Sequence, residues 1–332
     1  MTSGPGVLVL RALGLGDLLT AVPALRALRR HLPGHRMVLA APAALADAVS
    51  AIGVVDELLP AGGPDRAVPA VLDWSGPPPD LAVDLHGNGP PSLRVLTELR
   101  PARLIAFHHP SRPGVAGPAW RSDDGERARW CRLLRWYGIP ADPDDLRVPA
   151  PDRPSPAPGA VVLHPGADHG SRRWPPERFA AVARALRARG QPVALTAGPA
   201  ELPLARAVAE LAGMPPSAVL GGRLSFPDLA AVLAGARAVV SGDTGPAHLA
   251  TALGTPSVTL FGPLSPALWG PPDSRAHRAL WHPGPADGLR PGDPHADRPD
   301  VRLLRITPTE VLDALAALPP RSSVRHSPGA PP

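Results

Sequence analysis

Short apolar runs alternate with helical patterns along most of the chain, and this alternation constrains the fold more than any other feature. Short runs without polar alternation are typical of strands buried on both faces of a parallel sheet. Such runs lie at residues 7–11, 37–41, 81–84, 104–107, 161–163, 193–196, 238–241 and 257–261. Helical patterns lie at 18–32, 43–52, 127–137, 175–189, 201–211, 226–234, 246–253 and 307–318. This order predicts an α/β fold with parallel sheets.

A proline-rich segment divides the series into two halves. Residues 148–159 contain five prolines and no hydrophobic period, as expected for a stiff linker. We therefore predict two doubly wound, Rossmann-like domains, at residues 1–150 and 160–318, followed by a disordered tail at 319–332. Residues 269–299 are expected to form a loop, and Pro23 to kink its helix or to mark the first turn. Because ligands of parallel sheets bind at the carboxyl ends of the strands, the cleft between the sheets is the predicted site.

Composition excludes several classes of protein. All 34 basic residues are arginine, 29 residues are acidic and the formal net charge is +5. The isoelectric point near 10.8 mostly reflects missing lysine, and no basic run is interleaved with aromatic residues, so nucleic acid is not an expected partner. A single cysteine, Cys131, excludes an internal disulfide framework and a cysteine-based zinc site.

The hydropathy of the chain predicts a core but no membrane span. Apolar residues make up 44 % of the chain and charged residues 19 %, despite 49 prolines and 33 glycines. The longest charge-free apolar stretch has about ten residues, whereas a spanning helix needs about 20. The first six residues lack the basic region of a signal peptide. We expect a reduced, cytoplasmic protein that meets a membrane, if at all, only peripherally at its inner face.

The segment 241–248 is the strongest candidate site. An apolar strand ends at a turn with Gly242 and Gly245, and Pro246 starts the next helix. The free N–H groups and the dipole of that helix favour an anion, and Asp243 and His248 would project beside it. The alternative is that Asp243 or Thr244 only caps the helix.

Two further strand ends carry charged side chains. Arg172 and Arg173 precede a helix and could clamp a diphosphate with forked donors, or could belong to an ordinary solvated loop. Glu201 could bind a ribose diol, or merely favour a helix N-terminus. In the first half, Gly14 and Gly16 form only part of a dinucleotide motif. Asp17 beside them is either a helix cap or a general base facing the cleft.

Together these segments resemble glycosyltransferase family 9, the ADP-heptose:lipopolysaccharide heptosyltransferases, whose members have the GT-B fold. The similarity runs in order over about residues 6–318, and the Asp-Thr-Gly-x-x-His segment at 243–248 is its most specific part. The matching segments are 11–17, 23–25, 84–88, 164–166, 172–175, 198–201, 229–235, 242–248, 252–256, 261–263 and 306–311.

The resemblance implies an inverting, metal-independent transfer of a heptose or related sugar from an ADP-linked donor to an acceptor hydroxyl. It implies Asp17 as the base, with Gly14, Gly16, His86 and Asn88 on the acceptor side. It implies that the second domain binds the donor through Arg172, Arg173, Glu201, the backbone near Leu224, Asp243, Thr244, Gly245 and His248. No cofactor is implied besides the nucleotide-sugar co-substrate.

The chain departs from the usual family pattern at three of these places. Arg172 stands where lysine is common, His86 where glutamine or arginine is usual, and Leu264 where threonine is frequent. The arginine- and proline-rich composition is typical of a high-GC genome, so a glycan, lipid-linked or natural-product acceptor other than lipopolysaccharide is expected. A GT-B-like sugar-nucleotide epimerase or hydrolase, a dinucleotide-dependent oxidoreductase and a non-catalytic binding module stay open as alternatives.

Overall fold

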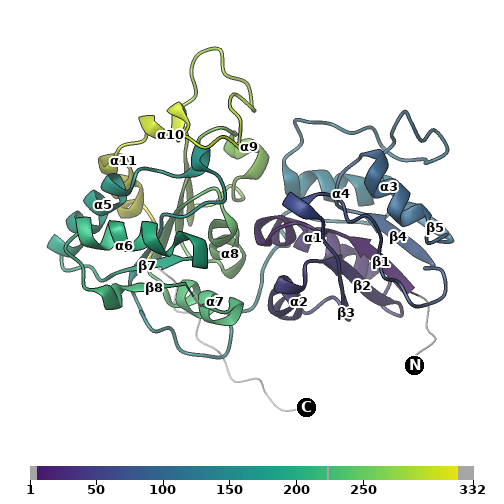
Figure 1. Cartoon of the computed structure of the whole chain (residues 1–332), viewed down its shortest axis with the longest axis horizontal. Coiled ribbons are helices and arrows are strands. Elements are labelled where there is room, and N and C mark those ends of the chain that lie inside the picture. The colour runs from purple at the N-terminus through teal and green to yellow at the C-terminus, as the bar shows by residue number, and fades with distance from the viewer. Residues whose placement is uncertain (1–5, 223, 321–332) are drawn as a thin grey trace.

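The computed structural model describes residues 6–222 and 224–320 and contains two parallel sheets. In Figure 1 they form two lobes side by side, the N-terminal one in purple and blue and the C-terminal one in teal to yellow. The expected disordered tail lies almost entirely outside the described residues.

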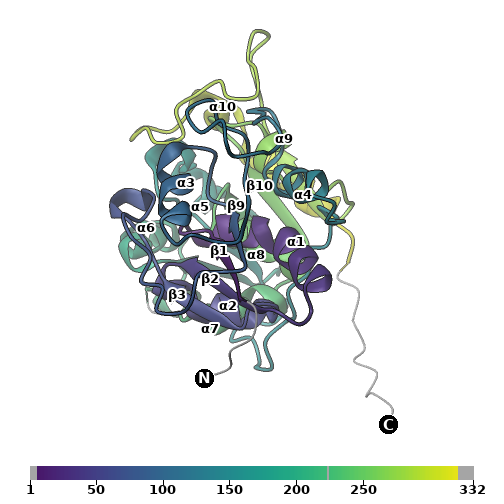
Figure 2. The same cartoon turned by 90° about the vertical axis from the view of Figure 1, so that its right-hand side faces the viewer.

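The N-terminal lobe is built on a five-stranded sheet with the order β3-β2-β1-β4-β5. Its buried strands are the apolar runs of the sequence, and its helices cover both faces (Figure 2). The strands are β1 (Gly6–Leu10), β2 (Arg36–Ala41), β3 (Glu57–Pro60), β4 (Leu81–Asp84) and β5 (Arg103–Ile105). The helices are α1 (Leu15–His31), α2 (Ala46–Ile52), α3 (Pro90–Thr97) and α4 (Glu126–Trp136).

The C-terminal lobe is built on a six-stranded sheet with the order β11-β10-β9-β6-β7-β8. The strands are β6 (Val161–His164), β7 (Val193–Ala197), β8 (Val219–Gly221), β9 (Ala238–Gly242), β10 (Ser257–Leu260) and β11 (His277–Leu280). The helices are α5 (Pro176–Ala188), α6 (Leu202–Leu211), α7 (Phe226–Gly235), α8 (Gly245–Leu253), α9 (Pro266–Trp269), α10 (Val301–Arg305) and α11 (Pro308–Ala316).

The strand order places the ligand crevice of each sheet. The chain starts in the middle of each sheet, builds one side, and then returns to build the other. The order therefore reverses between β1 and β4, and between β6 and β9. Ligands of open parallel sheets bind outside the strand carboxyl ends at this reversal. The loops after these four strands are those that carry the candidate residues of the sequence.

Two sequence expectations about the elements need correction. Pro23 does not mark the first turn of its helix, because α1 begins at Leu15 and Pro23 lies buried in its interior, and the alternative of a kink at Pro23 stays a prediction. The segment 269–299 is not only a loop, because β11 runs through it and pairs with β10. In both cases tertiary packing overrides the local preference that proline or a polar composition expresses.

The lobes pack together at the base of the cleft. Helix α1 contacts α8, α2 contacts α7, and α4 contacts α9. One cluster of buried apolar side chains continues from α1, through Val22 and Leu25, to Leu249 of α8. Within residues 6–222 and 224–320, no helix combines the length and hydropathy that crossing a membrane requires.

Candidate functional site

Asp17 sits in the first turn of α1, directly above the carboxyl end of β1. It is the third residue of the helix rather than its cap, which is Gly14. One carboxylate oxygen accepts a hydrogen bond from the Gly14 N–H at 3.2 Å, and the other lies 3.4 Å from Arg11. The side chain of Asp17 is 19 % exposed, so the carboxylate is both held in place and open to the cleft.

A buried ion-pair network lies behind Asp17. The guanidinium of Arg11 has no exposed surface, and it donates to Glu126 Oε1 at 2.9 Å and to the main-chain carbonyls of Asp17 and Leu85. Glu126, at the start of α4, also pairs with Arg129 and accepts from the Trp130 indole. Because unpaired buried charges are costly, this network fixes Arg11, and Arg11 in turn fixes the turn that bears Asp17.

The turn between β9 and α8 does not behave as a simple helix cap. Thr244 occupies the cap position, but its side chain makes no capping hydrogen bond, and its hydroxyl is buried without a partner among the described residues. Asp243 is almost buried and lies 3.3 Å from His248 Nε2. The reading in which Asp243 or Thr244 only caps α8 therefore does not fit the structure.

The loop after β6 carries two neighbouring arginines, Arg172 and Arg173, whose side chains make different contacts. Arg172 donates to the main-chain carbonyl of Asp243 at 3.1 Å, and its Nε is buried without a partner in the described chain. Arg173 points back and donates to the carbonyl of Ala167 at 2.8 Å. The buried hydroxyl of Ser171, the residue before Arg172, also lacks a partner within residues 6–222 and 224–320. Buried donors of this kind usually have a partner, so they mark a site for one.

Glu201 lies next to the end of β6, beside a second buried histidine. Its carboxylate accepts from the Gly198 N–H at 2.9 Å and lies 3.5 Å from His164 Nε2. Burial lowers the pKa of His164, although the Glu201 charge acts in the opposite direction. A Cβ at Gly166 would fall 2.1 Å from the Glu201 carboxyl carbon, so a larger residue there would displace the Glu201 carboxylate. Along the chain, Glu201 follows β7 and Leu224 follows β8.

The acceptor-side candidates gather on the loop after β4. His86 Nδ1 accepts from the Ala12 N–H at 3.2 Å, and burial together with the Arg11 charge lowers the pKa of His86 to about 4. The ring is therefore neutral at pH 7 and keeps its proton on Nε2. Asn88 follows on the same loop and is half-buried.

The two lobes meet at their glycine turns. A Cβ at Gly16 would lie 2.8 Å from His248 Cδ2, and one at Gly245 would lie 3.2 Å from Leu15. The structure thus brings the Asp17 turn and the Asp243–His248 turn into contact at the base of the cleft. An ion pair near Gly14 also joins the two lobes: Arg66 lies 2.7 Å from the carboxylate of Asp168. The backbone of Arg66 has a φ of 62°.

Sequence reasoning missed Glu126 and Arg66, and it quoted Arg11 only as part of a motif. Glu126 looks like an ordinary acidic residue in a first helical turn, and its partner Arg11 is 115 positions away. In the described parts of the chain, no group of three or more histidine, cysteine, aspartate or glutamate side chains is arranged to hold a metal ion.

Asp84, at the end of β4, allows a prediction about pH. Burial raises the pKa of this carboxyl from 3.8 to about 6, although hydrogen bonds from the His86 and Gly87 amides oppose the change. Folding is therefore favoured by protonated Asp84, and this contribution is present below pH 4 and lost as the pH rises through 6. As the pH rises from 4 to 7, the wild type should lose this contribution and Asp84→Asn should not. The unfolding free energy of the variant minus that of the wild type should therefore increase by about 3 kcal/mol over this range.

Urea denaturation of both proteins across that pH range measures this difference. The variant's own stability at pH 4 does not enter the test, because only the change with pH is compared. A difference that stays constant from pH 4 to 7 would mean that Asp84 is ionised in the folded state throughout.

Comparison with known proteins finds relatives for the part of the chain that carries the C-terminal half of this site. Residues 147–287 match the model of glycosyltransferase family 9 (heptosyltransferase). Lipopolysaccharide heptosyltransferase 3 of Escherichia coli is 33 % identical over 171 residues, which cover 50 % of this chain and 49 % of that protein. This part of the chain is similar to glycosyltransferase family 9. The aligned part spans about half the length of this curated relative.

The family 9 fold is seen over nearly the whole chain in solved structures. A glycosyltransferase family 9 protein from Veillonella parvula has a TM-score of 0.75 at 18 % identity, covering 95 % of this chain and 97 % of that one. The Escherichia coli ADP-heptose lipopolysaccharide heptosyltransferase II has a TM-score of 0.73 at 20 % identity, covering 94 % and 98 %. The chain accordingly has the GT-B fold of two Rossmann-like domains.

Proposed function

We propose that this chain is an inverting glycosyltransferase of family 9. It moves a heptose or related sugar from a nucleoside diphosphate donor, ADP-linked in the first instance, to a hydroxyl group of an acceptor. The donor binds to the C-terminal lobe, residues 160–318, and the acceptor to the N-terminal lobe, residues 1–150. The family's description and the names of its relatives suggest the sugar, while the residues of this chain suggest the chemistry.

One observation carries the proposal. A carboxylate on one lobe lies beside an anion-binding turn on the other, with Gly16 against His248. Around that turn, the buried polar atoms of Thr244 and Arg172 lack partners among the described residues. A nucleoside diphosphate would supply acceptors for them, and the N-terminus of α8 would favour its charge.

The reaction follows from these positions. The carboxylate of Asp17 takes the proton of an acceptor hydroxyl while the hydroxyl oxygen forms a bond to the anomeric carbon. The bond from that carbon to the diphosphate breaks on the opposite face, so the configuration inverts. The negative charge that develops on the diphosphate is stabilised by Arg172 and the N–H groups of Gly245 and its neighbours, and Arg173 joins them by leaving the Ala167 carbonyl that it contacts here. These donors perform the role that a metal ion would otherwise have.

Donor recognition extends from the diphosphate along the C-terminal lobe. Glu201 accepts from the ribose hydroxyls, and the backbone near Leu224 faces the base. Asp243 and His248 contact the sugar. The His164 ring lies against the Glu201 carboxylate and positions it. Burial lowers the pKa of His164, so this ring stays neutral.

The acceptor is a glycan, a lipid-linked saccharide or a natural product. Gly14 and Gly16 let it approach Asp17, and His86 and Asn88 border it. The neutral His86 ring offers a hydrogen-bond donor without charge. The enzyme acts in the cytoplasm, where a lipid-linked acceptor would bring it to the inner face of the membrane.

A thermal-shift screen tests the proposed function. A ligand that binds only the folded protein raises its unfolding temperature, so a nucleoside diphosphate or its sugar should stabilise the chain. The stabilising nucleotide sugar is then incubated with and without candidate acceptors. If the nucleotide sugar is consumed slowly without acceptor and fast with one, the protein is a transferase. If it is consumed at the same rate in both incubations, the protein is the sugar-nucleotide epimerase or hydrolase.

Arg172 provides a quantitative check on the donor site. Removing a charged hydrogen-bond donor to the diphosphate should weaken ADP binding by about 1.5–3 kcal/mol, so Arg172→Ala should raise the Kd for ADP roughly tenfold to a hundredfold. Arg172→Lys should recover part of this affinity, because it restores the charge but not the fork. Isothermal titration calorimetry makes the measurement. Arg206→Ala, at an exposed position of α6, is the matched control. Equal affinity in Arg172→Ala and the control would remove Arg172 from the donor site.

A further inference from the structure

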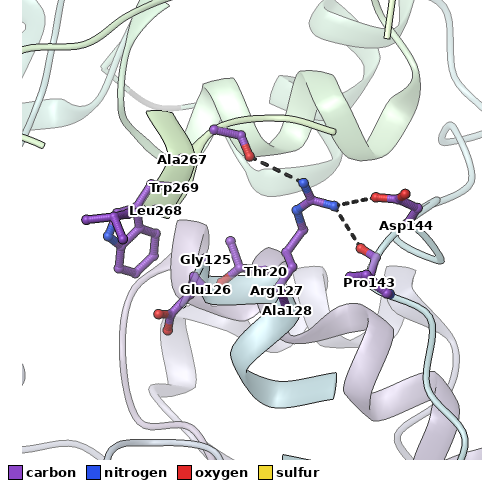
Figure 3. Close-up of a pocket in the computed structure, with 11 residues that line it drawn as sticks. Thr20, Gly125, Glu126, Arg127, Ala128, Pro143, Asp144, Ala267, Leu268 and Trp269 are labelled. Carbon is purple, nitrogen blue, oxygen red and sulfur yellow. Dashed lines mark hydrogen bonds and ion pairs between the residues drawn. The ribbon is translucent and has the colours of Figure 1, made fainter. Parts of the chain in front are cut away.

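A small pocket opens in the seam between the lobes, beside the site already described. It has a volume of about 220 Å³ and lies between α1, α4 and α9 (Figure 3). Thr20, Gly125, Glu126 and Ala128 line it from the N-terminal lobe, and Leu268 and Trp269 from the C-terminal lobe. In Figure 3 the Trp269 ring and the Glu126 carboxylate lie on the same side of the pocket, and Arg127 lies on the other.

The walls of the pocket are continuous with the proposed reaction centre. Arg11 Nη2 lies 3.4 Å from the Asp17 carboxylate and 2.9 Å from that of Glu126. The hydroxyl of Thr20 donates to the main-chain carbonyl of Asp17 at 2.9 Å. On the other lobe, the ring of Trp269 lies edge-on to that of His248, with 6.2 Å between centroids. A molecule in the pocket is therefore a neighbour of both turns.

The charges that line the pocket are already paired. Glu126 is neutralised by Arg11 and Arg129. Arg127 pairs with Asp144 at 2.8 Å and donates to the carbonyls of Pro143 and Gly270, as the dashed lines in Figure 3 show. A charged ligand would find no free counter-charge here and would lose its hydration. The pocket therefore favours an uncharged ligand.

The remaining surface suits a sugar ring. A tryptophan ring offers an apolar face and a polar edge, and a sugar likewise presents an apolar C–H face and a rim of hydroxyls. Thr20, Glu126 and Gly270 line the pocket, and their oxygens already accept from Arg11, Arg129 and Arg127 but keep lone pairs that can accept from that rim. The volume is below the roughly 300–1,000 Å³ of pockets for drug-sized ligands, so one ring fits rather than a chain.

We propose that this pocket binds one uncharged monosaccharide ring of the acceptor, with Trp269 as its stacking platform. The inference rests on the proposed function, because it needs an acceptor beside Asp17. The ring belongs to the acceptor because none of the donor loops, residues 164–173, 198–201 and 241–248, lines the pocket.

The test uses the full chain saturated with ADP and a panel of simple sugars. Binding of the methyl α-glycosides of glucose, galactose and mannose is followed by saturation-transfer NMR, with glucose 6-phosphate and glucuronate as charged comparisons. We expect a neutral glycoside to bind together with ADP and more tightly than either charged sugar. Trp269→Ala should weaken its binding at least tenfold, and Trp269→Phe should restore part of it.

A variant that fills the pocket keeps the test independent of the tryptophan. Ala128 is exposed on α4 and lines the pocket, so Ala128→Phe should abolish glycoside binding without disturbing the core. Ala188→Phe, exposed on α5, is its matched control and should bind as wild type does. The ADP affinity should be the same in all of these proteins.

Several results would overturn the pocket proposal. They are no binding of any neutral glycoside, tighter binding of a charged sugar, displacement of the glycoside by ADP, and unchanged binding in Ala128→Phe. Each of these leaves the proposed function standing as long as ADP binds. Failure of the wild-type chain to bind ADP would instead contradict the proposed function itself.

Discussion

Asp17→Asn is expected to lower the rate of sugar transfer by a factor of about 10² to 10⁴, the contribution of a positioned general base. Asparagine keeps the shape of the side chain and an oxygen that can accept from the Gly14 N–H, but it cannot take a proton. The affinity for ADP should stay nearly the same, because the donor loops lie on the other lobe. Release of the nucleoside diphosphate, measured with acceptor present, gives the rate, and calorimetry gives the affinity.

Asp47→Asn is a matched control for this variant. Asp47 also lies in the first turn of a helix of the N-terminal lobe, α2, but it is exposed and is not part of the turns at Gly16 and Gly245. It should transfer sugar as wild type does. A large loss of ADP affinity in Asp17→Asn would move Asp17 to the donor site, and unimpaired transfer would remove its role as the base.

Arg11→Met is expected to have the largest effect on stability, a loss of about 3–5 kcal/mol in unfolding free energy. The buried guanidinium holds Glu126, the carbonyls of Leu85 and Asp17, and one carboxylate oxygen of Asp17. Without it, the buried Glu126 carboxylate keeps its ion pair with Arg129 but loses the one with Arg11. The carbonyls of Leu85 and Asp17 lose their hydrogen-bond donor. Urea denaturation at pH 7 measures the loss.

The exposed pair of Arg94 and Glu98 on α3 supplies the control for Arg11→Met. These side chains are more than half exposed and 3.9 Å apart, so Arg94→Met should change stability by less than about 1 kcal/mol. Arg11→Lys should fall between the two, because it keeps the charge without the forked geometry. Equal stability of the two methionine variants would show that the buried network contributes nothing.

The sequence was sufficient to predict the central strands and the turns that follow them. Strands β1, β6 and β9 are buried on both faces, so they read as unbroken apolar runs. Glycines such as Gly16 and Gly242 then mark where each strand gives way to a helix. The positions of Asp17, Arg172 and His248 at the carboxyl edges followed from this pattern alone.

Three of the four edge strands could not be predicted, whereas the fourth, β5, overlaps the apolar run at 104–107. Strands β3, β8 and β11 have only three or four residues each and are partly exposed, so their apolar pattern is too weak to stand out. Helix α3 begins with two prolines after a glycine, which is also typical of a loop. In each case the element forms because a neighbouring strand or sheet face is already in place.

Pairings between distant residues were also beyond the sequence. Arg11 and Glu126 are separated by 115 positions, and the link from Arg66 to Asp168 spans 102. In the sequence, each of these residues looks like an ordinary charged residue. Only the folded chain reveals that Arg11 supports the Asp17 turn and that the two lobes meet at Gly16 and His248.

The central claim is that a nucleoside diphosphate sugar binds at the cleft where these turns meet. Calorimetric titration of the wild-type chain with ADP tests it most directly, with UDP and GDP as comparisons. We predict saturable binding at one site per chain for at least one of these nucleotides, unchanged in Asp17→Asn and weakened in Arg172→Ala. No binding of any of the three would contradict the account.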